Sequence, residues 1–137
     1  MINLIKQESK KIREWAIKAN GNDCDLSNWC TICSYLIFKR LKARGLDPIF
    51  CSVVQYGSGV KAHCFVFCNE HIIDVTADQF GIKKDIVVRH NPNRKHRFWF
   101  WNFQDALEFK DIVDIEKHLD LWEDCCNPKK KFRKKCA

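Results

Sequence analysis

One stretch, residues 28–45, constrains the fold most, because it has the pattern of a buried helix. Apolar side chains recur along it at helical spacing, and the basic side chains between them are expected to face water. Gly45 predicts the C-terminal end, since glycine readily takes the left-handed conformation that a helix C-terminus favours. Ser27 or Asn28 is expected to cap the N-terminus. The rest of the chain should therefore be arranged around this helix.

A cysteine, Cys30, lies in the first turn of the predicted helix. A thiol there is surrounded by unpaired N–H groups at the positive end of the helix dipole, and both favour the thiolate. Thiolate is the nucleophilic form of cysteine. Cys30 is therefore a candidate nucleophile, with an inert buried thiol as the alternative.

The remaining pattern predicts an α+β fold. We expect another helix over 3–19, strands over 49–56, 62–68, 71–76, 86–89 and 98–101, and helical segments over 105–110 and 114–124. Helices followed by strands joined through short turns favour an antiparallel sheet, packed here by the helix of residues 28–45. A length of 137 residues suits one domain, which we place at 1–128, followed by a basic tail at 129–137.

The hairpin formed by 62–68 and 71–76 has a register that can be derived. If residues 69–70 form a two-residue loop, the numbers of paired residues sum to 139. His63 and Asp74 are then diagonal neighbours on one face, roughly 7–8 Å apart at the backbone, which an imidazole and a carboxylate can bridge. A loop longer by one residue would put Asp74 on the other face.

Cysteine, histidine and an acid together indicate covalent acyl-transfer chemistry. The cysteine attacks a carbonyl, the histidine moves the proton, and the acid orients the imidazole and stabilises its charged form. Cys30, His63 and Asp74 are the candidates for these three roles. A strand histidine or a surface acid would be the structural alternatives, and Asp78 is the fallback acid.

The three-part pattern resembles the transglutaminase-like superfamily of papain-related folds, especially its small bacterial and phage members. Cys30 begins a helix that ends at Gly45, His63 lies in Ala-His-Cys-Phe-Val, and Asp74 lies in the segment Ile-Ile-Asp-Val-Thr-Ala-Asp-Gln-Phe-Gly. The resemblance covers residues 24–81 and implies a papain/transglutaminase-like fold with a Cys-His-Asp triad. Cys33 is a departure, because the family usually has a small residue there.

Several residues near the candidate triad have two interpretations. The backbone N–H of Cys30 is the natural first donor of an oxyanion hole, which needs two. Asn28 or the indole of Trp29 could supply the second, but either is as readily a cap or a core residue. Gln79 could bind substrate, although bracing of its loop is favoured. Cys33 is interpreted as a packing residue one turn deeper in the helix.

The nine cysteines are expected to be mostly reduced. Their number is odd and no secretory signal is visible, so a disulfide framework is not predicted and a cytoplasmic location is favoured. The Cys30/Cys33 and Cys64/Cys68 spacings suggest zinc, but Cys64 and Cys68 would lie about 13 Å apart along a strand, too far for one ion. We therefore predict no metal and no cofactor.

A net charge of +7 raises the question of whether the protein binds an acidic partner. The basic runs at 94–97 and 129–137 are either solvated segments or contacts for an acidic partner. No apolar run reaches the ~18 residues that a membrane span requires. The favoured hypothesis is a thiol peptidase, amidase or deamidase acting on a protein or peptide. Transfer of the acyl group to an amine instead of water would make it a transglutaminase or acyltransferase. The rival is a catalytically idle member of the fold that binds protein or nucleic acid through the basic runs.

Overall fold

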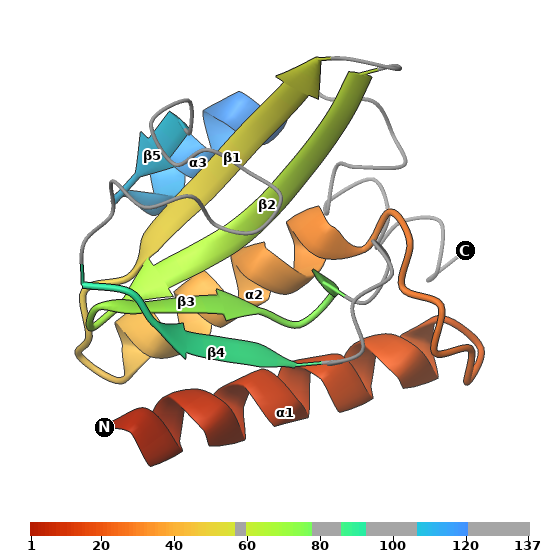
Figure 1. Ribbon diagram of the computed structural model, residues 1–137, viewed down its shortest axis with the longest axis horizontal. Helices are drawn as coiled ribbons and strands as arrows, with labels where there is room; N and C mark the ends of the chain where they lie inside the picture. The colour runs from red at the N-terminus through yellow and green to blue at the C-terminus, as the bar shows by residue number, and fades with distance from the viewer. Residues whose placement is uncertain (57–59, 78–85, 93–106, 121–137) are drawn as a thin grey trace.

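The computed structural model describes residues 1–56, 60–77, 86–92 and 107–120. Its elements are α1 (Ile2–Ala19), α2 (Cys30–Ala43), β1 (Ile49–Tyr56), β2 (Val60–Cys68), β3 (His71–Asp74), β4 (Val87–His90), β5 (Leu107–Phe109) and α3 (Ile112–Leu119). The strands form one antiparallel sheet in the order β4-β3-β2-β1-β5 (Figure 1). The fold class is therefore α+β, as predicted.

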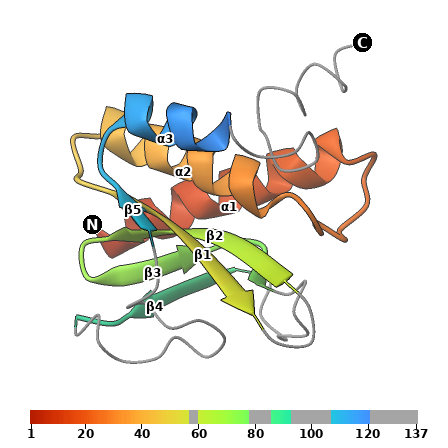
Figure 2. The same ribbon diagram turned by 90° about the horizontal axis from the view of Figure 1, so that it is seen from above.

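The three helices lie on one face of the sheet (Figure 2). Strand alternation divides the buried side chains between the two faces. Toward the helices lie residues that include Phe50, Cys64, Val66 and Ile73, which pack with α1 and α2 in the main core. A second buried cluster comprises Cys51, Val53, Phe65, Phe67 and Ile72. Both faces of the central strands are thus buried, so any polar side chain on them needs a partner.

The helix at the centre of the fold ends as predicted. Gly45 has a φ of +80°, the left-handed conformation, and donates its N–H to the carbonyl of Lys42 at 3.0 Å. Leu46 donates to the carbonyl of Leu41 at 3.1 Å, which completes a Schellman motif. The predicted cap at the other end is wrong. Trp29 is the N-cap of α2, and no side chain in the described part of the chain makes a capping hydrogen bond there.

A buried carboxylate joins α1 to α2. Glu8 lies on the buried side of α1 with a side chain that is 0% exposed. Its two oxygens accept from Arg40 Nε at 2.7 Å and from an Arg44 terminal nitrogen at 3.2 Å. Arg13, one and a half turns further along α1, donates to the Val75 carbonyl at 2.5 Å just after β3. These bonds hold α1 against both α2 and the sheet.

The predictions for the C-terminal third need correction. Residues 105–110 were expected to be helical, but Leu107–Phe109 is strand β5, which pairs with β1. Pairing to an open sheet edge outweighs the local helical pattern here. The helix expected over 114–124 begins at Ile112, where the Asp111 carboxylate accepts the Val113 N–H at 2.7 Å as an N-cap.

Other predictions lie outside the described residues: the strand at 98–101, the basic runs at 94–97 and 129–137, and the domain boundary at 128. Among the helices that the structure describes, none is long and apolar enough to cross a bilayer.

Candidate active site

The β2–β3 hairpin has the predicted register. Val66 pairs with Ile73 and Cys68 with His71, so paired numbers sum to 139. Asn69 and Glu70 form the two-residue loop, with φ values of 50° and 63°. Positive φ at both positions gives the turn the twist that a tight hairpin requires. The prediction for this register is confirmed.

The register brings His63 and Asp74 together. His63 Nε2 lies 2.5 Å from Asp74 Oδ2, and the two residues are 0% and 2% exposed. The other carboxylate oxygen of Asp74 accepts the Thr76 backbone N–H at 3.0 Å and lies 3.4 Å from the Thr76 hydroxyl. With both oxygens engaged, the carboxylate has one orientation and holds the imidazole in place.

The pair lies where β2 and β3 separate. The described ladder between the two strands stops at Val66 and Ile73, while β2 extends beyond it beside β1. The first turn of α2 lies at this end of the molecule, near the C-terminal end of β3 (Figure 1). Cys30, the first residue of α2, is close enough to His63 and Cys64 for both to influence the pKa of its thiol.

The surroundings of Cys30 favour its thiolate. Cys30 is 6% exposed, and burial by itself would raise the pKa of the thiol. The neighbouring Cys64 thiol is the largest influence and lowers the pKa of Cys30, and the neighbouring His63 ring lowers it further. The net pKa of Cys30 is well below its ordinary value.

His63 shows the complementary shift. Burial opposes the charged ring, but the attraction and hydrogen bond of Asp74, together with the influence of the neighbouring Cys30 thiol, raise the pKa of His63 to about 10. A histidine with that pKa is protonated at neutral pH. Cys30 and His63 thus favour a thiolate–imidazolium pair, the charge state that a cysteine nucleophile uses.

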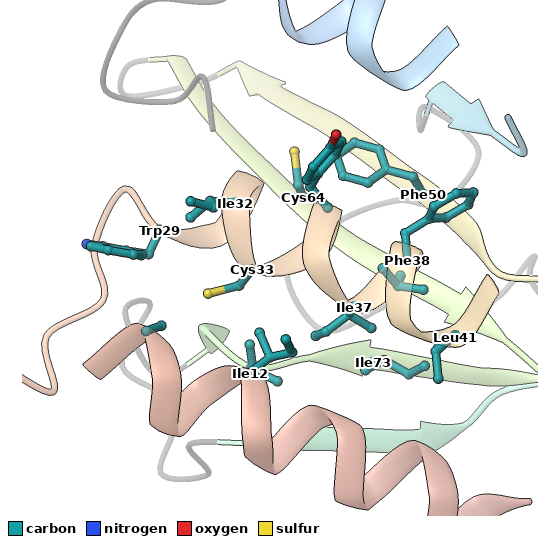
Figure 3. Close-up of a cluster of buried hydrophobic side chains, with 14 of the residues drawn as sticks. Ile12, Trp29, Ile32, Cys33, Ile37, Phe38, Leu41, Phe50, Cys64 and Ile73 are labelled. Atoms are coloured by element: carbon teal, nitrogen blue, oxygen red, sulfur yellow. The ribbon is translucent and has the colours of Figure 1, made fainter. Parts of the chain in front are cut away.

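Cys33 is the other thiol of α2, and it points toward α1 and away from Cys64 (Figure 3). It is 1% exposed and belongs to the main core cluster. The structure therefore places Cys33 in the packing role expected for it.

Cys64 was missed as a site residue, because sequence reasoning treated the strand cysteines as small apolar side chains. The signal that could have found it is alternation: Cys64 follows His63 and must face the helices, where Cys30 begins α2. Thr31 was missed too. Its hydroxyl lies 3.9 Å from the Cys30 sulfur and donates to the Cys64 sulfur at 3.7 Å.

The candidate oxyanion donors have different surroundings. The Trp29 indole donates to Asn20 Oδ1 at 3.2 Å and packs edge-on against Trp15 with ring centroids 6.0 Å apart. This favours the core alternative for Trp29. Asn28 is exposed and left-handed, with a φ of 68°. Gln79 and the fallback acid Asp78 lie outside the described residues.

The described cysteines are free thiols: Cys24, Cys30, Cys33, Cys51, Cys64 and Cys68. Within the same part of the chain, no three His, Cys, Asp or Glu side chains are grouped so that they could hold a metal ion.

Comparisons with known proteins leave the site to be interpreted from its own chemistry. A scan against models of known protein families, a search of curated proteins and a search of solved structures each found no match.

Proposed function

We propose that this protein is a cysteine-dependent acyl-transfer enzyme with Cys30 as nucleophile, His63 as acid and base, and Asp74 as the residue that orients His63. The observation that carries the proposal is the buried 2.5 Å bond between His63 and Asp74, made by a histidine that also interacts with Cys30. A buried acid–imidazole pair beside a thiol of lowered pKa is the arrangement that thiol acyl transfer needs.

The steps follow from the charge state. The Cys30 thiolate attacks the carbonyl carbon of an amide, and the carbonyl electrons move to oxygen. As the tetrahedral intermediate collapses, the C–N bond breaks and the amine leaves with the imidazolium proton. Since Nε2 of His63 is bound to Asp74, this proton comes from Nδ1. A thioester on Cys30 remains.

The second half of the reaction, hydrolysis of the thioester, regenerates the enzyme. Water attacks the thioester carbon while neutral His63 takes its proton, the C–S bond breaks, and a carboxylic acid is released. An amine in place of water would give transamidation. We favour hydrolysis of a protein or peptide amide, because water is always present and no acceptor-binding group is identified among the described residues. This assignment agrees with the resemblance to the transglutaminase-like superfamily.

Trapping the acyl-enzyme tests the proposal. The protein is treated with an electrophilic peptide probe that acylates or alkylates nucleophilic thiols, and the adduct is mapped by mass spectrometry. We expect one adduct, on Cys30, and a peptide-amide library should yield a thioester of the matching mass. Cys30→Ala should form neither.

Cys33→Ala is the matched control, since Cys33 lies one turn away on the same helix. It should keep the adduct and most of the turnover. Labelling spread evenly over the cysteines, or an adduct that survives Cys30→Ala, would contradict the proposed function.

A further inference from the structure

A buried arginine on α1 reaches the segment that carries the candidate acid. Arg13 is 5% exposed, and its Nη1 donates to the Val75 carbonyl at 2.5 Å. Val75 and the neighbour of Arg13 on α1, Ile12, belong to the same buried core cluster, so this contact lies inside the protein. A guanidinium is always charged, and a charge taken out of water needs hydrogen bonds to offset the cost. The residue directly after Asp74 is therefore held by a charged donor.

The peptide group that joins Val75 to Thr76 makes a hydrogen bond at each end. Its carbonyl oxygen accepts from Arg13, and its N–H donates to Asp74 Oδ1 at 3.0 Å. The peptide bond is trans, so its C=O and its N–H point in opposite directions. The cation thus meets the carbonyl end of the peptide dipole, and the carboxylate meets the N–H end.

These contacts form a continuous series from α1 to the imidazole. After the peptide N–H has bonded Oδ1 of Asp74, the other carboxylate oxygen, Oδ2, bonds His63 Nε2 at 2.5 Å. Every residue of the series beyond Arg13 is at most 2% exposed. Hydrogen bonds in such a series polarise one another when water is excluded. A charged donor on the carbonyl therefore strengthens the N–H bond that fixes the carboxylate.

We propose that Arg13 is a positioning residue of the active site, which fixes and polarises the Val75–Thr76 peptide so that Asp74 presents one carboxylate oxygen to His63. The role rests on the proposed function, because it assigns the residue that holds the acid of the triad. A carboxylate bonded through one oxygen can turn about its Cβ–Cγ bond, whereas the peptide N–H fixes the second oxygen. The Thr76 hydroxyl, 3.4 Å from Oδ1, assists on the same side.

The alternative is that Arg13 only holds α1 in place. Glu8 has a role of that kind on the same helix, since its carboxylate bonds Arg40 and Arg44 near the end of α2. Its bonds join helix to helix, not helix to the segment after β3. Glu8→Gln is therefore the matched control, because it removes a buried contact of α1 and should leave the reactivity of Cys30 unchanged.

The test is the rate of Cys30 alkylation by iodoacetamide at pH ~6, where only a thiol of lowered pKa is largely thiolate. The modified residue is mapped by mass spectrometry, and the stability of each variant is measured separately by chemical denaturation. A less firmly held Asp74 stabilises the imidazolium less, and the imidazolium favours the thiolate. Arg13→Met keeps the apolar stem without the donor and should slow alkylation by roughly fivefold, as for the loss of one hydrogen bond.

Arg13→Lys is the conservative variant. It keeps the charge and a donor on a slightly shorter side chain, so it should restore the rate to within roughly twofold of the original. An Arg13→Met rate equal to that of Glu8→Gln and of the unmodified protein would overturn the proposal.

A double-mutant cycle separates positioning from a structural role. If Arg13 acts through Asp74, Arg13→Met should slow alkylation by less than roughly twofold in the Asp74→Asn background, because the charge that it positions is already gone. Two independent roles would give effects that multiply. A fivefold effect of Arg13→Met that persists in Asp74→Asn would therefore overturn the proposal.

A second measurement does not depend on how well Arg13→Met folds. A coupling between two residues acts in both directions, so Asp74→Asn should shift the NMR signals of the Arg13 guanidinium N–H groups. Asp114→Asn, an exposed position on α3, should leave these signals in place. Arg13 signals that stay unchanged in Asp74→Asn would also overturn the proposal.

Failure of the proposed function has a different signature. Cys30 of the unmodified protein would then react only near the ordinary thiol pKa of about 8.5, and Asp74→Asn would leave its rate unchanged. The positioning role fails alone if Asp74→Asn slows alkylation and Arg13→Met does not.

Discussion

His63 Nε2 and Asp74 Oδ2 lie 2.5 Å apart, although the two residues come from different strands. They are diagonal neighbours across the hairpin, and this distance exists only in the register that a two-residue turn imposes. The second carboxylate oxygen of Asp74 accepts a hydrogen bond from the Thr76 backbone N–H. The two-residue turn at Asn69 and Glu70 thus determines that Asp74 lies beside His63.

Asp74→Asn should lower turnover by roughly one to three orders of magnitude, on a scale of about 1.4 kcal/mol per tenfold. Asparagine preserves the shape but loses the charge that holds the His63 proton. The loss should be smaller than in a serine triad, because a thiolate–imidazolium pair needs no proton transfer before attack. The Cys30 thiolate should also titrate at higher pH. Asp114→Asn, an exposed acid on α3, is the control, and equal profiles for the two variants would exclude Asp74 as the partner.

The activity should have an alkaline limit set by His63, because its pKa is raised to about 10. The folded pKa exceeds the ordinary value of about 6.5, so the imidazolium stabilises the folded state fully below ~6.5, and that contribution is lost as pH rises through about 10. Turnover should fall over the same alkaline range, since the leaving group then lacks its proton. Titration of the His63 ring by NMR checks this, and a midpoint near 6.5 would contradict it.

Glu8→Gln should destabilise the fold by about 1–3 kcal/mol, because hydrogen bonds between charged partners are lost from a buried position. The hydrogen bond with Arg40 is the main cause that lowers the pKa of Glu8, so its stabilising effect is present above the unfolded pKa and is lost on acidification. Chemical denaturation measures the change. Glu14→Gln, an exposed position on α1, should change stability by no more than about 0.5 kcal/mol. Equal effects of the two substitutions would show that the α1–α2 contact carries no stability.

Glu70→Gly should stabilise the protein by about 0.5–1 kcal/mol. Glu70 has a φ of 63°, which costs a residue with a side chain about 1 kcal/mol or more but costs glycine little. Asn-Gly is also the preferred pair for this turn. Glu70→Gln keeps the side chain and removes the charge that faces His90, so it separates the two effects and should be nearly neutral. Thermal melting of both variants decides whether backbone strain or the charge matters.

Much of the fold could be predicted from local pattern. Helix α1, helix α2 (Cys30–Ala43) and the strands of the hairpin follow from side-chain spacing and turn residues. The diagonal position of His63 and Asp74 followed too, since a two-residue turn leaves only one register. Where pattern failed, at Leu107–Phe109, the strand exists only because β1 offers an edge to pair with.

The sequence by itself determined the helix that carries Cys30, the turn that aligns the hairpin, and the acid that faces the histidine, because each depends on contacts between neighbours along the chain or across one tight turn. Only the tertiary structure decided what surrounds the Cys30 sulfur. Thr31 contacts Cys64 because α2 packs on β2. Ser52 lies beside Cys64 because β1 pairs with β2, and His118 of α3 contacts Ser52. Such contacts depend on how elements are placed in space, and periodicity along the chain carries no record of that placement.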